Sequence, residues 1–291
     1  MTSGFLIVDK PEGITSNQVV GYVKQATGVK KVGHAGTLDP MATGALVTAV
    51  GKVTRLIKYI QDQPKEYLAT AQFGVATDTL DADGAVLTRE PMDFTTEEIE
   101  ALVPRFTGTI SQVPPMVSAL KKDGRRLYEL AREGQVVDRD ARSVEVHELE
   151  IVSVGAPPYP LIEFRVVCGK GTYVRSLADD MAAVLGGAAH LTSLRRTRVG
   201  SLRASQGVTI DDIQNWEDYF LTPAEGIGDL DLVTVDAETA RGVRNGVRFV
   251  AGPILDGPPE EPYGVLDPED DLIAVYRRVG DHAEPDVVLP S

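Results

Sequence analysis

The spacing of apolar residues along the chain predicts short strands and helices in mixed order. Residues 5–8 are continuously apolar and predict a buried strand. Thr15 or Ser16 can cap a helix over 16–27, which carries valines on one face. Residues 33–44 are rich in glycine and lack an apolar period, so we expect an ordered loop there.

The middle of the chain adds more strands and one clear helix. Alternating residues over 67–73 predict a half-buried strand, and 144–154 and 161–168 predict two more. Thr172 can cap a helix that Gly186 ends. Because the elements do not alternate as regular βαβ units, the predicted fold class is α+β with a mixed, mostly antiparallel sheet.

The end of the chain differs in composition and predicts a second domain. An acidic shift near 204–230 indicates a boundary, and we expect domains over 1–228 and 229–291. Three short apolar runs among glycine and proline predict a small β-rich module: Leu232–Val235, Val247–Val250 and Leu272–Val275.

Charge is divided unevenly between these parts. The formal net charge is −14, yet residues 1–203 hold 24 basic and 24 acidic residues. Residues 204–291 hold 5 basic and 19 acidic residues, which accounts for the whole imbalance. We therefore expect any phosphate-binding face on the first part, whereas the acidic tail would repel RNA.

Several functional classes are disfavoured by what the sequence lacks. A single cysteine, Cys168, allows no intrachain disulfide and fits a reducing compartment, and its apolar flanks predict a buried strand thiol. The four histidines show no metal-ligand spacing. No apolar run reaches about 18 residues and no signal peptide is evident, so we expect a cytoplasmic protein. Phosphate-loop and dinucleotide-binding motifs are missing, which disfavours kinases and NAD enzymes.

Three segments contain candidate chemistry, and each has a plainer alternative. Asp39 lies in the glycine-rich loop with His34; an Asp-Pro pair is also a common turn, and His34 can be a structural hydrogen-bonding residue. Arg175 lies in the first turn of a helix, where the helix dipole disfavours a cation, so a specific carboxylate or phosphate partner is expected unless it is simply exposed. Tyr67 can stack on an extruded base or can be an ordinary strand tyrosine.

Taken together and in order, these segments resemble the TruB family of tRNA pseudouridine synthases. The resemblance covers about residues 4–203. The segments that carry it are Gly4–Pro11, Gly13–Ser16, Val32–Gly44, Lys65–Tyr67, Thr77–Gly84, Gln112–Lys121, Gly171–Leu177 and His190–Thr197.

The resemblance implies a fold and a reaction. It implies a pseudouridine-synthase catalytic domain on a bisected antiparallel sheet, which isomerises the uridine at tRNA position 55, in the T-loop, without cofactor or metal. Asp39 matches the nucleophilic aspartate, and Arg175 matches the arginine paired with it. Tyr67 matches the tyrosine that stacks on the target base and is a candidate general base. Three chemical routes suit such an aspartate: attack on ribose C1′, attack on uracil C6, or promotion of a glycal.

The resemblance also implies contacts with the RNA. Tyr173 and Leu194 match residues that line the pocket, and His34 matches a histidine that packs against the T-loop. The stretch 114–140 resembles an insertion that closes on the RNA, here called the thumb; its basic residues Lys121 and Arg125 are candidate RNA contacts. Val117 departs from the aromatic residue that many members carry. The tail stands where bacterial relatives carry a PUA domain.

These implications give the expected partner and leave rival functions open. The expected partner is the tRNA T-stem-loop, bound by a monomer with no obligatory protein partner and no membrane. One rival is a non-catalytic RNA chaperone that refolds tRNA, an activity that can also accompany catalysis. Another is a guide-RNA-dependent relative acting on ribosomal RNA. A third is a metabolic enzyme whose motifs match by coincidence.

Overall fold

The computed structural model describes residues 3–118, 121–122, 125–126, 133, 135, 137–258 and 260–290. The chain forms two compact units. Unit 1 comprises Met1–Asp39, Gly44–Gln63 and Arg198–Ser291, and unit 2 comprises Pro40–Thr43 and Pro64–Thr197. The predicted boundary between domains 1–228 and 229–291 was drawn from the charge composition, whereas these two units are defined by contacts. The boundary therefore stays a prediction.

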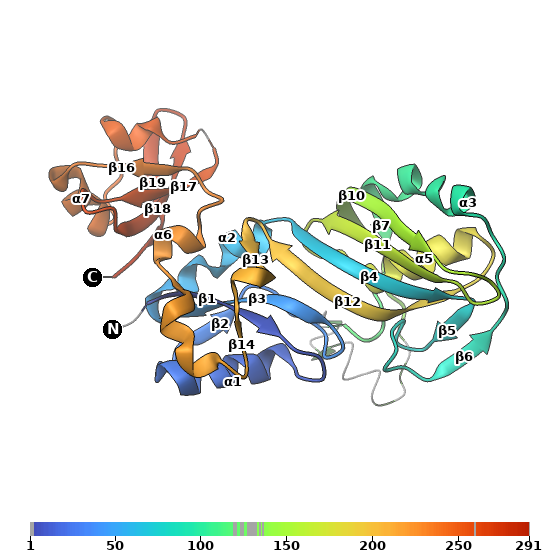
Figure 1. Cartoon of the computed structure of the whole chain (residues 1–291). Helices are drawn as coiled ribbons and strands as arrows, with labels where there is room; N and C mark the ends of the chain where they lie inside the picture. The colour runs from blue at the N-terminus through green and yellow to red at the C-terminus, as the bar shows by residue number, and fades with distance from the viewer. Residues whose placement is uncertain are drawn as a thin grey trace. The chain divides into compact units, whose positions relative to one another are not determined.

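Strand β1 is the centre of unit 1. It pairs antiparallel with β3 along its whole length and parallel with β14 at its other edge (Figure 1). The β-strands of this part are β1 (Gly4–Lys10), β2 (Val32–His34), β3 (Thr43–Val50), β13 (Leu202–Arg203), β14 (Val208–Thr209) and β15 (Phe220–Leu221). Its helices are α1 (Ser16–Thr27), α2 (Ile57–Asp62), α6 (Pro223–Gly226) and the 3₁₀ helices η1 (Gly51–Leu56), η3 (Ala204–Gln206) and η4 (Ile213–Tyr219).

Helix α1 forms where its sequence signals predict it. Thr15 caps its first turn in a reciprocal capping box with Gln18. Val19, Val20 and Val23 are buried on one face, and Gly28 ends the helix in the left-handed conformation, at φ +68°.

The last part of unit 1 is a four-stranded sheet in the order β16-β17-β18-β19 (Figure 1). Its elements are β16 (Leu232–Thr234), α7 (Ala237–Arg244), η5 (Pro253–Asp256), β17 (Pro262–Leu266), β18 (Leu272–Val279) and β19 (His282–Val288). Leu266, Leu272 and Val275 of this module are buried in the same apolar cluster as Phe5 and Ile7 of β1. The module and the β1 region therefore share one core.

Unit 2 is built on a curved antiparallel sheet with strands in the order β12-β4-β11-β10-β7 (Figure 1). These strands are β4 (Lys65–Phe73), β7 (Gly108–Gln112), β10 (Arg142–Val154), β11 (Leu161–Cys168) and β12 (Ala189–Val199), whose last two residues belong to unit 1. Smaller elements are β5 (Val75–Thr77), β6 (Val86–Arg89), α3 (Thr96–Glu100), η2 (Val103–Phe106), β8 (Lys121–Lys122), β9 (Arg125–Arg126) and α5 (Val174–Val184).

One face of the unit 2 sheet is apolar and the other is polar. Ala69, Ala71 and Phe73 alternate along β4 with no exposed surface, and helix α5 packs against this strand. Cys168 ends β11 as the predicted buried thiol, and burial raises its pKa to about 11, which makes it unreactive.

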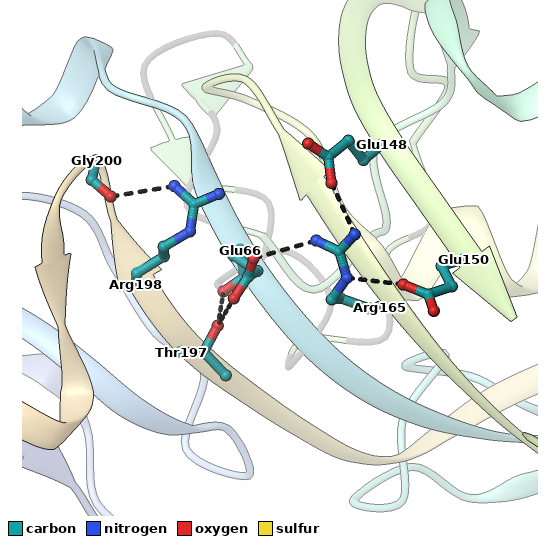
Figure 2. A network of polar contacts seen from close by, with 7 residues as sticks. All are labelled: Glu66, Glu148, Glu150, Arg165, Thr197, Arg198 and Gly200. Carbon is teal, nitrogen blue, oxygen red and sulfur yellow. Dashed lines mark hydrogen bonds and ion pairs between the residues drawn. The ribbon is translucent and has the colours of Figure 1, made fainter. Parts of the chain in front are cut away.

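The polar face carries a network of charges that joins four strands (Figure 2). Arg165 on β11 forms ion pairs with Glu66 on β4, at 3.2 Å, and with Glu148 and Glu150 on β10, at 2.7 and 3.0 Å. The Thr197 hydroxyl on β12 donates to Glu66 at 2.7 Å. These contacts fix the register of β4 at the residue before Tyr67.

Four local predictions were wrong or incomplete. Val32–His34 is a strand paired with β3, although we expected a loop from residue 33. Thr172 does not cap α5: the cap position is Tyr173, which makes no side-chain cap bond. The run Val247–Val250 forms no strand beyond one isolated bridge, at Phe249, and helix α7 was not predicted.

Candidate functional site

The loop that carries Asp39 is fastened to helix α1 by a single hydroxyl. Buried Ser16 donates to the Leu38 carbonyl at 3.0 Å and accepts from the Leu38 amide at 2.9 Å. The Ala35 amide donates to the Val47 carbonyl at 2.9 Å, which ties the start of the loop to β3. The partly exposed Asp39 therefore follows a backbone position that is fixed on both sides.

His34 lies on β2 and takes part in the same loop. Its Nδ1 accepts a hydrogen bond from the Gly36 amide at 3.4 Å. This contact agrees with the expectation that His34 is a structural hydrogen-bonding residue. Its packing against the T-loop of the RNA stays a prediction. Gly36 has a φ of +139°, a region where residues with a side chain are strained.

Arg175 is a buried cation at the start of helix α5. Only 2% of its side chain is exposed. Its Nη1 donates to Asp81 Oδ2 at 3.0 Å and to the Thr79 carbonyl at 2.8 Å, while Nη2 donates to the Val117 carbonyl at 2.8 Å. The expectation of a specific carboxylate partner for Arg175 is confirmed within unit 2, and that partner is Asp81.

Asp81 was not singled out by sequence reasoning, although it lies in the segment Thr77–Gly84. It is 5% exposed, and its Oδ1 accepts from the Thr79 hydroxyl and from the Asp83 amide. A buried carboxylate with this many donors is fully satisfied, so the Arg175–Asp81 pair forms a rigid support. One sequence signal could have identified Asp81: it is an acidic residue in Thr77–Gly84, one of the segments that carry the family resemblance. The predicted pairing of Arg175 with Asp39 joins residues of different units and stays a prediction.

Tyr173 precedes the helix and is held by its backbone. Its amide donates to Gln112 Oε1 at 2.7 Å, and its carbonyl accepts from Gln112 Nε2 at 3.0 Å. Gln112 is buried, and this pair of bonds fastens the end of β7 to the start of α5. The Tyr173 side chain is left half-buried.

Tyr67 and Leu194 lie on neighbouring strands of unit 2. Tyr67 is a half-buried residue of β4 opposite Val166, and Leu194 on β12 is 7% exposed. By strand alternation, Tyr67 shares a face with Ala69, the face against which α5 packs. Unit 2 therefore contains Tyr67, Leu194 and the start of α5, whereas unit 1 contains Asp39 and His34.

The structure describes both ends of the thumb and short pieces between them. Lys121 pairs with Arg126 in the β8–β9 ladder, and its side chain lies outside the described residues. Arg125 is exposed and forms an ion pair with Glu133. The apolar positions Leu127, Leu130 and Ala131 predict a short basic helix over 125–133, but most of this range lies outside the described residues, and its first two residues form strand β9 instead. Arg139 Nη1 donates to the Pro114 carbonyl at 3.1 Å, which closes the two ends of the thumb.

Two further properties concern metals and membranes. No group of three or more His, Cys, Asp or Glu side chains suited to a metal ion occurs among the described residues. Within that same part of the chain, no helix is both long enough and apolar enough to span a membrane.

Comparison with known proteins assigns the family. The TruB family pseudouridylate synthase N-terminal domain matches residues 24–174, and the tRNA pseudouridylate synthase B C-terminal domain matches residues 175–227. The tRNA pseudouridine synthase B of Symbiobacterium thermophilum is 45% identical over 84% of this chain and 82% of its own. That of Thermobifida fusca is 42% identical over 99% of both chains.

The predicted fold class is confirmed by a solved structure. In the crystal structure of a Cbf5–Nop10–Gar1 complex, one chain superposes with a TM-score of 0.75 and 23% identity, over 99% of this chain and 85% of that one. This likeness concerns the fold alone. Because the chain matches the family's domains and is more than 40% identical to two of its members, it belongs to the TruB family of pseudouridylate synthases.

Proposed function

We propose that this protein isomerises uridine 55 in the T-loop of tRNA to pseudouridine, with Asp39 as the nucleophile. Family membership makes the chain a pseudouridine synthase, which is an isomerase, and the curated relatives are named tRNA pseudouridine synthase B. In this reaction the bond between ribose C1′ and uracil N1 breaks, a C1′–C5 bond forms, and the C5 proton is exchanged for one on N1. Atoms balance without a co-reactant.

The observation that supports the proposal best is the buried Arg175 at the start of α5. A carboxylate must stay ionised to attack, although an extruded base fills the pocket and excludes water. A neighbouring guanidinium favours the ionised form of a carboxylate. Arg175 is held by Asp81 and two carbonyls, so its position costs no rearrangement when the substrate binds.

The remaining residues have proposed roles in holding the RNA. Extruding a base from a folded loop costs a few kcal/mol, and stacking on Tyr67 offsets part of this cost. Tyr173 and Leu194 provide pocket walls, and His34 packs against the T-loop. Lys121 and Arg125 contact the RNA from the thumb. We further propose a monomer that needs no protein partner, an accompanying tRNA-folding activity, and a PUA-like module over 229–291 that adds little RNA affinity.

The test is Asp39→Asn assayed on a synthetic T-stem-loop. This change keeps the shape of the side chain but removes the nucleophile, so pseudouridine formation should fall by more than about 1,000-fold, a range typical of losing a covalent nucleophile. RNA binding should persist. Normal turnover by the variant would refute the assignment of Asp39.

The same assay separates the rival functions. A non-catalytic chaperone predicts no pseudouridine from the wild-type protein, and a metabolic enzyme predicts no RNA binding. A guide-RNA-dependent enzyme predicts no activity of the purified chain on a bare stem-loop. Activity of the wild-type chain alone on that RNA therefore excludes all three.

A further inference from the structure

Helix α5 does not begin with the residues that usually cap a helix. Its N-cap residue is Tyr173, which is not one of the types preferred there, and the Tyr173 side chain makes no capping bond. The third helical residue, where a Glu or Gln completes a capping box, is Ser176. The Ser176 hydroxyl donates to the Val113 carbonyl at 3.0 Å. The start of α5 is therefore held by bonds to another segment of the chain.

Gln112, the last residue of strand β7, supplies the missing cap. Its Oε1 accepts from the Tyr173 amide at 2.7 Å, and its Nε2 donates to the Tyr173 carbonyl at 3.0 Å. The bond to the N-cap amide is the one that a Glu or Gln of the first turn makes in a capping box. Here the residue that makes it lies 61 positions earlier in the chain, within the same unit.

The two bonds from Gln112 fix the backbone of Tyr173 on both sides. Gln112 is 2% exposed, so water cannot readily replace either bond. The Tyr173 carbonyl also accepts from the Leu177 amide at 3.0 Å, the first bond of the helix. Because the direction of a side chain follows from the backbone of its own residue, Gln112 sets where the Tyr173 side chain leaves the chain. It does so two residues before the buried Arg175.

We infer that Gln112 is a positioning residue for the reaction, acting through Tyr173 on the extruded uridine. The inference rests on the proposed function, in which Tyr173 is a wall of the pocket. A tyrosine at the N-cap gives up the usual capping bond, and Gln112 makes the bond in its place. The Tyr173 side chain then serves the pocket from a backbone that is already fixed before the substrate binds. Gln112 itself contacts no RNA in this arrangement, so it should affect the rate of reaction more than RNA affinity.

The experiment compares Gln112→Met with wild type in single-turnover reactions on a T-stem-loop, with the enzyme in saturating excess. Methionine nearly keeps the volume of glutamine but removes the amide. The rate constant for pseudouridine formation should fall by about 10- to 100-fold, as expected when a group that holds the reactant is displaced. In the Asp39→Asn background, where no turnover occurs, adding Gln112→Met should change the Kd for the RNA by less than about 3-fold.

This pair of measurements separates positioning from stability. Gln112→Met should also lower Tm, by about 2–8 °C, because buried backbone groups lose their partner. A purely structural role would lower Tm and the folded fraction, but the folded molecules would still react at the wild-type rate constant under saturating enzyme. Gln112→Asn carries the same amide on a side chain too short to reach both backbone groups. It should lower the rate constant as well, and it provides the test if Gln112→Met does not fold.

Ser176→Ala is the matched control, because it removes a neighbouring bond between the same two segments and leaves the bonds to Tyr173 in place. It should lower Tm, whereas its rate constant should stay within about 3-fold of wild type. A wild-type rate constant in a folded Gln112 variant overturns the inference alone. An equal loss of rate in Ser176→Ala also overturns it, because the effect would then come from fastening the two segments in general. Inactive wild-type protein instead refutes the proposed function.

Discussion

Ser16 makes two hydrogen bonds with one hydroxyl, and both go to the residue before Asp39. The serine is buried at the first turn of α1, so water cannot replace either bond. The position of Asp39 therefore depends on a side chain 23 residues earlier in the sequence. Asp39 is the proposed nucleophile, and small displacements of a reacting group lower rates steeply, because catalysis requires near-attack geometry.

Ser16→Ala should accordingly affect both stability and rate. Leaving the buried Leu38 amide and carbonyl without their partner should cost about 1–3 kcal/mol of unfolding free energy. On a T-stem-loop, kcat should fall more than KM rises. Thr15→Ala is the matched control: it removes the helix cap, at about 1 kcal/mol, but leaves the bonds to Leu38. An equal loss of kcat in the two variants would contradict a specific role for Ser16.

The residue scale also shows where sequence reasoning reached its limit. An arginine in the first turn of a helix predicts a specific carboxylate or phosphate partner, because the helix dipole opposes a cation there. The sequence could not say that this partner was Asp81, since the two residues are 94 positions apart and meet only through the fold.

At the scale of elements, strong local signals predicted structure and weak ones did not. Helix α1 has a capping box, an apolar stripe and a terminal glycine, and each was readable. Strand β2 has only three residues, and it exists because Val32–His34 pairs with β3. Helix α7 does have a cap at Asp236. Its eight residues include Gly242, however, and they are too few to show a clear helical spacing of apolar residues. Pairing between distant segments decided the cases that the local pattern missed.

Helix α5 contains two adjacent acids whose ionisation opposes folding. Burial, followed by the neighbouring charge of Asp179, raises the pKa of Asp180 to about 6. Because the folded state holds this proton more tightly than the unfolded state, stability falls as pH rises from about 4 to about 6 and stays lower above that.

Asp180→Asn should therefore stabilise the protein at neutral pH. The expected gain is about 1–2 kcal/mol at pH 7, after allowance for the partial exposure of Asp180. At about pH 4 the two proteins should unfold at the same temperature, because the wild-type carboxyl is then protonated in the folded state. Thermal unfolding followed from pH 4 to pH 7 gives the comparison, and parallel curves for the two proteins would be inconsistent with it.

At the scale of the whole molecule, the acidic C-terminal module is a structural part of unit 1. Its residues Leu266, Leu272 and Val275 share an apolar cluster with Phe5 and Ile7 of strand β1. Composition sets the tail apart by its charges, whereas the contacts in this cluster are made by the apolar minority of the tail. The excess of acid that disfavours RNA does not prevent this packing, since a few of the carboxylates bind basic side chains of the same unit.

Asp286 is the clearest of these carboxylates. It accepts from Lys58 Nζ at 2.6 Å and from the Tyr59 hydroxyl at 2.8 Å, which joins β19 to α2. Burial works against the charged carboxylate, but the bonds from Lys58 and Tyr59 outweigh it and lower the pKa of Asp286. Burial and the bond to Asp286 raise the pKa of Tyr59, so the phenol keeps its proton as the donor.

This arrangement predicts a pH-dependent contribution to stability from Asp286. A carboxyl whose pKa is lower in the folded state stabilises the protein above its unfolded pKa of about 4, and this contribution is lost as pH falls through the folded value. Asp286→Asn should therefore unfold more easily than wild type at pH 7, and the difference should shrink below pH 4. Urea unfolding at pH 7 and near pH 3 measures it, with exposed Glu217→Gln as the control that should match wild type at pH 7. A difference that stays constant across this range would show that packing, and not the charge of Asp286, holds β19 against α2.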